Sequence, residues 1–161
     1  MAGSVPAGAA HRGTIREACE KIPLNILLDT DVLIDVALDR QPHGQPASDL
    51  LDEIERGRVT GYFSWHTASN FYYLVSPRRG NKDAKLFLVE LMRFVAVAPA
   101  STRSLQYGAS LEMKDFEDAM QVAAAIACGA EVIATRNLRD YRNSPIRAVD
   151  AQDLLALIRE G

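Results

Sequence analysis

The sequence that decides the fold is Asn25-Ile26-Leu27-Leu28-Asp29-Thr30-Asp31-Val32-Leu33. A short apolar run ends abruptly in two carboxylates, and an apolar pattern with helical spacing follows. Because the apolar run shows no alternation, it predicts a strand that is buried on both faces, as in a parallel sheet. Such a strand delivers Asp29 to the carboxyl edge of the sheet, where open α/β sheets bind their ligands.

Two further acidic segments lie downstream of this strand. One is Asp115-Phe116-Glu117-Asp118, at the head of an alanine-rich helical run. The other follows the apolar run 131–135, which ends in Arg136-Asn137 with Asp140 just beyond. If the strands are parallel neighbours, all three acidic ends meet at one edge of the sheet. The rest of the chain is then the scaffold that brings them together.

Strands and helices alternate along the chain, which predicts an α/β fold around a mainly parallel sheet. Strands are expected at 24–29, 59–64, 94–97 and 131–135, with a short fifth at 147–149. Helices are expected at 32–38, 46–57, 66–75, 82–93, 101–112 and 115–128, and again after Asp150. Residues 76–80 are expected to form a basic loop. Residues 1–23 are expected to be a flexible extension with a short helix at 14–21, and residues 24–161 to be the domain.

The composition is that of one ordinary globular domain. The 161 residues are 48% apolar and 24% charged, and the net charge is −3. A nucleic acid would therefore have to be held by local basic patches rather than by a global field. Two cysteines do not make a disulfide framework, which suits a reducing cytosol. No apolar stretch approaches the roughly 18 residues of a membrane span, so the protein is expected in the cytoplasm.

The chemistry of the sequence lies in its carboxylates. Like charges that are held close together repel, so a carboxylate cluster persists only if it is protonated, finds a cation or binds a metal. Oxygen ligands without a Cys/His set point to Mg²⁺ or Mn²⁺ rather than to structural zinc. Asp115 and Asp118 are three residues apart and share one helix face, and Asp29 would enter from the strand. Such a metal activates water and neutralises phosphoryl charge, which favours phosphate-ester hydrolysis.

Each of these residues also has a purely structural interpretation. Asp115 and Asp31 could be the N-caps of the helices that they begin. Asp140 could pair with Arg136 or Arg142 at the surface. The histidines have no ligand spacing and are expected to be solvated; they are His11, His43 and His66.

Three ordered motifs resemble those of PIN-domain proteins. They are Leu27-Leu28-Asp29-Thr30-Asp31-Val32-Leu33, Asp115-Phe116-Glu117-Asp118-Ala119-Met120-Gln121 and Thr135-Arg136-Asn137-Leu138-Arg139-Asp140-Tyr141. The resemblance covers about residues 24–158. It implies a three-layer α/β/α sandwich around a mainly parallel sheet of four or five strands. It also implies a Mg²⁺- or Mn²⁺-dependent endoribonuclease, often the VapC-like toxin of a toxin–antitoxin pair.

The resemblance also implies which residues act. The Asp of the first strand and the Asp of the central helix are metal ligands in this family, and they map to Asp29 and Asp118. Asp115 is a third candidate ligand. The family's fourth acid lies in or just after a Thr-x-Asn/Asp segment, where the nearest carboxylate is Asp140. The residues expected to hold the RNA are Thr135, Arg136, Asn137, Arg78 and Arg79.

One position departs from the family pattern. The second acid, usually Glu or Asp on the helix after the second strand, is replaced by Asn70. An amide can coordinate a metal through its carbonyl oxygen, but it brings no charge. The expected catalytic set is therefore Asp29, Asn70, Asp118 and Asp140. Asp115 and Asp31 are the candidates to compensate for the missing charge.

Two other classes of protein stay open at this point. Asp29-Thr30-Asp31 is similar to the Asp-x-Asp nucleophile of haloacid-dehalogenase-type phosphatases, although Lys114 is poorly placed for the lysine that those enzymes need. A PIN scaffold that lost catalysis through Asn70 would instead bind RNA or protein without cleaving it. The ribonuclease interpretation implies an RNA substrate, an antitoxin partner and a homodimer, with no membrane involved.

Overall fold

The computed structural model describes residues 23–161, and a five-stranded parallel sheet forms its centre. The strands lie in the order β3-β2-β1-β4-β5, and every neighbouring pair is parallel. Their bounds are β1 Asn25–Leu28, β2 Thr60–Phe63, β3 Val95–Val97, β4 Val132–Ala134 and β5 Arg147–Val149. The expected mainly parallel sheet of four or five strands is confirmed, and all of its strands run the same way.

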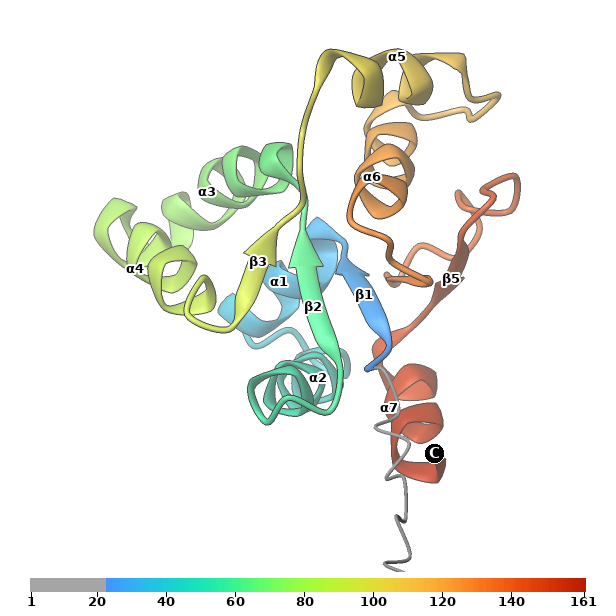
Figure 1. Cartoon of the computed structure of the whole chain (residues 1–161). Coiled ribbons are helices and arrows are strands. Elements are labelled where there is room, and N and C mark those ends of the chain that lie inside the picture. The colour runs from blue at the N-terminus through green and yellow to red at the C-terminus, as the bar shows by residue number, and fades with distance from the viewer. Residues whose placement is uncertain (1–22) are drawn as a thin grey trace, which may run out of the picture.

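Seven helices of the described residues cover the two faces of this sheet (Figure 1). They are α1 Thr30–Ala37, α2 Gly44–Glu55, α3 Trp65–Arg79, α4 Asn81–Leu91, α5 Thr102–Ser110, α6 Phe116–Ala127 and α7 Ala151–Glu160. Helices α1 to α4 and α7 pack on one face, α6 packs on the other, and α5 packs against α6. The three-layer α/β/α sandwich is therefore confirmed.

The side chains of β1 alternate between these two layers. Ile26 and Leu28 belong to the core under α1 to α4, whereas Leu27 belongs to the core under α6. All three are completely buried. This explains why the run shows no polar alternation, because both faces of the central strand are covered.

The order of the strands places a topological switch point beside β1. The chain runs from β1 through β2 to β3 on one side and then crosses to β4 on the other side of β1. Ligands bind at such a switch point, outside the carboxyl ends of the strands. The residues that follow β1 and β4 here are Asp29 and Thr135, and Asp29 N donates to Ala134 O at 2.9 Å.

The expected basic loop at 76–80 is wrong for most of its length. Helix α3 continues to Arg79, with Pro77 inside it, and ends at Gly80. Pro77 lacks the N–H that would bond to the carbonyl four residues earlier. The residue is exposed and lies in the last turn, so the helix loses little stability there.

The expected helix at 14–21 lies outside the described residues. Among residues 23–161, no helix combines the length and apolarity that a bilayer crossing requires.

Candidate active site

Asp29 is held at the carboxyl end of β1 by four hydrogen-bond donors. It is the N-cap of α1 and is 5% exposed. Its Oδ1 accepts from Thr30 N at 2.6 Å and Gln121 Nε2 at 3.1 Å. Its Oδ2 accepts from the hydroxyls of Thr135 at 2.8 Å and Tyr141 at 3.0 Å. Because a carboxylate offers about four lone-pair positions, all of those on Asp29 are occupied.

The environment of Asp29 opposes its charge in spite of these donors. Burial raises the pKa of the Asp29 carboxyl above its ordinary value, and the nearby charge of Glu117 raises it further. The hydrogen bond from Thr135 lowers this pKa and partly offsets the effect of burial. Asp29 is therefore a negative charge in a place that favours a nearby cation.

Arg136 is tied to two acids on α1. Its Nε lies 2.8 Å from Oδ2 of Asp35, which is 1% exposed, and its backbone N donates to Oδ2 of Asp31 at 3.0 Å. Burial, followed by the charge of Asp29, raises the pKa of Asp31 to about 7. The expectation that Asp31 caps α1 is wrong, because Asp29 occupies the cap and Asp31 lies in the first turn.

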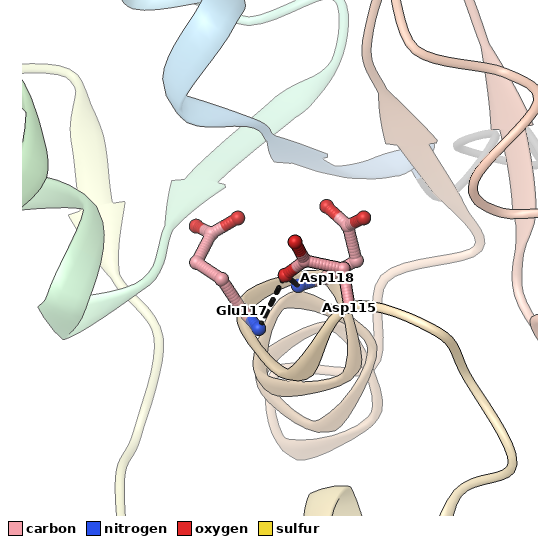
Figure 2. Close-up of side chains that lie close together, drawn as sticks. All are labelled: Asp115, Glu117 and Asp118. Atoms are coloured by element: carbon pink, nitrogen blue, oxygen red, sulfur yellow. Dashed lines mark hydrogen bonds between the residues drawn. The ribbon is translucent and has the colours of Figure 1, made fainter.

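The start of α6 brings three carboxylates together (Figure 2). Asp115 is the N-cap, and its Oδ1 accepts from the backbone N of Glu117 at 2.8 Å and of Asp118 at 3.3 Å. One possible ligand oxygen from each of the three residues lies within 4.8 Å of the others. The structural interpretation of Asp115 as a cap is thus confirmed, and the same geometry gathers the acids.

Asp118 is the most open of the buried carboxylates. It is 6% exposed, and no donor among residues 23–161 hydrogen-bonds to its carboxylate. Burial raises its pKa to about 6, with smaller contributions from the charges of Asp29, Asp115, Glu117 and Asp140. Asp118 therefore faces the other acids and keeps its oxygens available.

Glu117 extends from α6 toward α3. The sequence did not predict it as a site residue. Its Oε1 lies 3.1 Å from Nε2 of His66, 3.5 Å from Nδ2 of Asn70 and 3.1 Å from Nε2 of Gln121. The expectation that His66 is solvated is wrong, because its side chain is 19% exposed and contacts Glu117. The contact between Glu117 and Gln121 could have been predicted from the sequence, because residues four apart share one face of a helix.

The loop after β4 supplies the remaining acid. Asp140 lies close enough to Asp118 to raise its pKa. The alternative in which Asp140 pairs with Arg136 or Arg142 is not found in the described part of the chain, and its carboxylate accepts a hydrogen bond from Nδ2 of Asn137. The hydroxyl of Thr135 lies 2.8 Å from Oδ2 of Asp29 and 3.2 Å from Oδ2 of Asp31, and so joins the strand end to α1. The structure thus brings together the acidic residues that the sequence singled out.

Arg78 and Arg79 lie away from these acids. Both belong to the last turn of α3, whereas His66 and Asn70 lie in its first half. At 1.5 Å per residue, Arg79 is about 13 Å along the helix from Asn70. Arg79 also donates from Nη1 to Ala37 O at 2.7 Å. The two arginines therefore do not line the carboxylate cluster.

A pocket of about 400 Å³ lies next to the cluster, between the start of α3, the segment after β3 and α6. His66 belongs to the wall of this pocket and also contacts Glu117, so the pocket adjoins the acids at His66. Trp65, which is 73% exposed, and Met120 supply apolar surface. The other lining residues are Ser64, Ala98, Pro99, Ala100, Ser101, Thr102, Ser104, Leu105, Ala123 and Ala124.

The donor set fits a hard divalent cation. Its ligating atoms are carboxylate oxygens, with an amide at Asn70, which are the ligands that Mg²⁺ and Mn²⁺ prefer. Oε1 of Gln121 and Oδ1 of Asp31 are buried without a hydrogen-bond partner among residues 23–161. Burial is the main cause of the raised pKa values of Asp29 and Asp118, and the charges of neighbouring carboxylates add to it. The residues present therefore fit a hard divalent cation.

A family model described as PIN domain matches residues 25–139, which is more than half of the chain. The chain belongs to the PIN-domain family. This membership confirms the resemblance of the three acidic motifs, and it leaves the haloacid-dehalogenase alternative without support. No curated protein matches this PIN domain in sequence.

Solved structures share the fold of this PIN domain at low sequence identity. VapBC2 from Rickettsia felis, bound to a promoter DNA fragment, has a TM-score of 0.63 at 15% identity, covering 79% of this chain and 98% of its own. DNA-bound VapBC from Salmonella typhimurium has a TM-score of 0.60 at 18% identity, covering 80% of this chain and 98% of its own. VapC20 from Mycobacterium tuberculosis has a TM-score of 0.55 at 16% identity, covering 67% of this chain and 86% of its own. At these identities the likeness concerns the fold alone.

The metal-free protein is expected to lose stability as the pH rises. In the unfolded chain the carboxyls of Asp31 and Asp118 titrate near about 4. In the folded chain their pKa values are about 7 and about 6, so the native state retains protons that the unfolded state has lost. Stability from these groups is therefore complete below about pH 4 and falls as the pH passes through the folded values. Melting temperatures in EDTA across this range measure the effect.

The variant Asp31→Asn isolates this dependence. It should flatten the fall in melting temperature between about pH 5 and pH 8, because the amide that replaces the carboxyl cannot lose a proton. The exposed Asp52 of α2 provides the control, since Asp52→Asn should leave the slope unchanged. A melting temperature that rises with pH through this interval in the wild type would contradict the account.

Replacing Arg136 should lower stability because it leaves Asp35 buried and unpaired. We expect Arg136→Ala to cost about 2–3 kcal/mol, less than for a fully buried pair because Arg136 is partly exposed. Adding Asp35→Asn should recover part of the loss. Urea unfolding measures both changes, with Arg139→Ala as the surface control. If Arg136→Ala is as stable to urea as Arg139→Ala, the ion pair with Asp35 does not stabilise the fold, and Arg136 is available to bind the substrate.

Proposed function

We propose that this PIN-domain protein is a Mg²⁺- or Mn²⁺-dependent endoribonuclease that acts as a VapC-like toxin. One observation carries the proposal: Asp115, Glu117 and Asp118 each place a possible ligand oxygen within 4.8 Å of the others, and Asp29 at the end of β1 lies near enough for its charge to raise the pKa of Asp118. Such an excess of negative charge favours a divalent cation. The solved relative from Mycobacterium tuberculosis is described as a sarcin-ricin loop cleaving toxin, which supports RNA as the substrate class.

The metal would be held by Asp118 and Asp29, with Asp115 beside them. When bound, such an ion polarises phosphoryl oxygens and lowers the pKa of a coordinated water. Asp118 is the residue with the greatest freedom to coordinate, because no described donor occupies its carboxylate. Asp29 would exchange one of its four donors for the metal, and the hydroxyls of Thr135 and Tyr141 are the donors that can rotate away.

The loop after β4 and the neighbouring pocket would hold the RNA. Asn137 and Asp140 are exposed beside the acids, where a phosphodiester would approach. The pocket of about 400 Å³ is large enough for a nucleobase, and Trp65 offers a π-face for stacking. Arg136 is engaged by Asp35, so its contribution would be to position the loop, while Arg78 and Arg79 could contact only a more distant part of the RNA.

An antitoxin and a second copy of the chain are the proposed protein partners. Two of the structural relatives are VapBC complexes bound to DNA, which supports an antitoxin as the partner of this domain. Helices α3 and α4, with the residue that ends α4, carry exposed apolar side chains that a partner could cover: Tyr73, Leu74, Leu86, Val89 and Met92. The cytoplasm is the proposed location.

A catalytically weakened scaffold is the second candidate function. Asn70 brings no charge, and all the lone pairs of Asp29 accept hydrogen bonds. Both features would weaken metal binding. The scaffold would then bind RNA without cleaving it, which the experiment below distinguishes.

Asp118→Asn should strongly slow metal-dependent RNA cleavage. We expect the wild type to cleave an RNA mixture with Mg²⁺ or Mn²⁺ and not with EDTA. The variant should be slower on the order of a hundredfold, because a metal ligand supplies part of several kcal/mol of transition-state stabilisation. Gel analysis of the products measures this, with Asp52→Asn as the matched control.

Binding of RNA is followed separately through Trp65, the only tryptophan of the chain. Asp118→Asn should still bind RNA, with quenching of Trp65 fluorescence, although it does not cleave. Binding without cleavage in the wild type would favour the scaffold. Cleavage that persists in EDTA would contradict a metal-dependent ribonuclease.

A further inference from the structure

Helix α3 faces the carboxylate cluster without any acid of its own. Its sequence, from Trp65 to Arg79, contains neither Asp nor Glu. The polar side chains that it directs to the cluster are those of His66 and Asn70, an imidazole and an amide. The charge on this side of the site must therefore come from another element.

Glu117 supplies a charge at this place. Although it belongs to α6, its Oε1 lies within 3.5 Å of a nitrogen of both His66 and Asn70. Nε2 of Gln121 approaches the same oxygen at 3.1 Å, so three side chains converge on Oε1. Oε2 has no such partner among residues 23–161, which leaves one oxygen of Glu117 free for a ligand.

The two other candidates to replace the missing charge are already engaged. Asp115 accepts two backbone N–H groups as the cap of α6. Asp31 accepts from Thr135 and from the backbone of Arg136 on the opposite side of Asp29. Among the described residues, neither has a hydrogen bond or ion pair with α3, whereas Glu117 does.

Gln121 gives an independent indication that a ligand belongs here. It is completely buried, and its Nε2 lies 3.1 Å both from Asp29 and from Glu117, so the amide stands between the two acids. Its Oε1 has no hydrogen-bond partner among the described residues. A buried amide oxygen without a partner is costly unless another species satisfies it.

We propose that Glu117 is a metal ligand, which provides from α6 the carboxylate that α3 lacks at Asn70. This inference rests on the proposed metal site and deepens it. His66, Asn70 and Gln121 are positioning residues, because they hold Oε1 of Glu117. Figure 2 shows the carboxylates of Glu117 and Asp118 extending to the same side of the start of α6. The departure at Asn70 is then an exchange of position between two helices and not a loss of charge.

The test is Mn²⁺ binding by calorimetry on the full chain. We expect Glu117→Gln to weaken the affinity by about tenfold or more, as the loss of a charged ligand requires. The control Glu131→Gln removes an equal charge from an exposed residue before β4, at the opposite edge of the sheet, and should bind like the wild type. Without metal, Glu117→Gln should melt at a higher temperature than the wild type, because it removes like-charge repulsion from Asp29 and Asp118.

The double variant Glu117→Gln with Asn70→Asp tests the exchange of position. It returns a carboxylate from α3, and the near-identical shapes of Asn and Asp let it fit without repacking. We expect the affinity to return to within about threefold of the wild type, a recovery that a purely structural Glu117 would not produce. Failure of the double variant to recover any affinity overturns the exchange.

The outcomes separate this inference from the proposed function. If Glu117→Gln binds Mn²⁺ as tightly as the wild type, Glu117 is no ligand, and the inference is overturned while the ribonuclease proposal stands. If all variants follow the expected order but the wild type cleaves no RNA, Glu117 is a ligand and the proposed function is wrong. A wild type that binds no Mn²⁺ overturns both.

Discussion

The structure depends on holding a carboxylate at the end of a buried strand. Asp29 follows a strand with no exposed side chain between Ile26 and Leu28, so its charge must be satisfied almost entirely by protein groups. Four donors do this, and they come from α1, α6 and the segments after β4. The same hydrogen bonds that make the charge tolerable therefore also fix the relative positions of the elements that form the site.

The consequence of this arrangement is repulsion among the acids. Asp118 and Glu117 approach Asp29 from α6, and the local cation, Arg136, is already paired with Asp35 on the other side. Burial and like charge together raise the pKa values of Asp29 and Asp118. Carboxyl groups with perturbed pKa values are concentrated at the functional sites of proteins. A divalent cation is the simplest species that relieves the repulsion and uses the all-oxygen donors.

The sequence predicted the sheet and the acidic motifs because both depend on local patterns. The buried run before Asp29 and the cap at Asp115 are visible as short motifs, and parallel pairing then brings them to one edge. The contacts of Glu117 with His66 and Asn70 were not predictable, because they join residues roughly fifty positions apart through side-chain directions that no local pattern encodes. The ion pair of Arg136 with Asp35 was also not predicted, because it joins residues that are far apart in the sequence. A basic residue in a loop is more often solvated than paired with a buried acid.

The central claim is that carboxylates from β1 and α6 form a single metal site at the carboxyl edge of the sheet. A crystal of the full chain grown with Mn²⁺ tests it most directly, through the anomalous scattering of the ion. The account predicts one strong peak with the carboxylate oxygens of Asp29, Glu117 and Asp118 at about 2.2 Å, in the octahedral range of hard cations. An empty cluster, or a peak bound only by surface residues elsewhere, would contradict it.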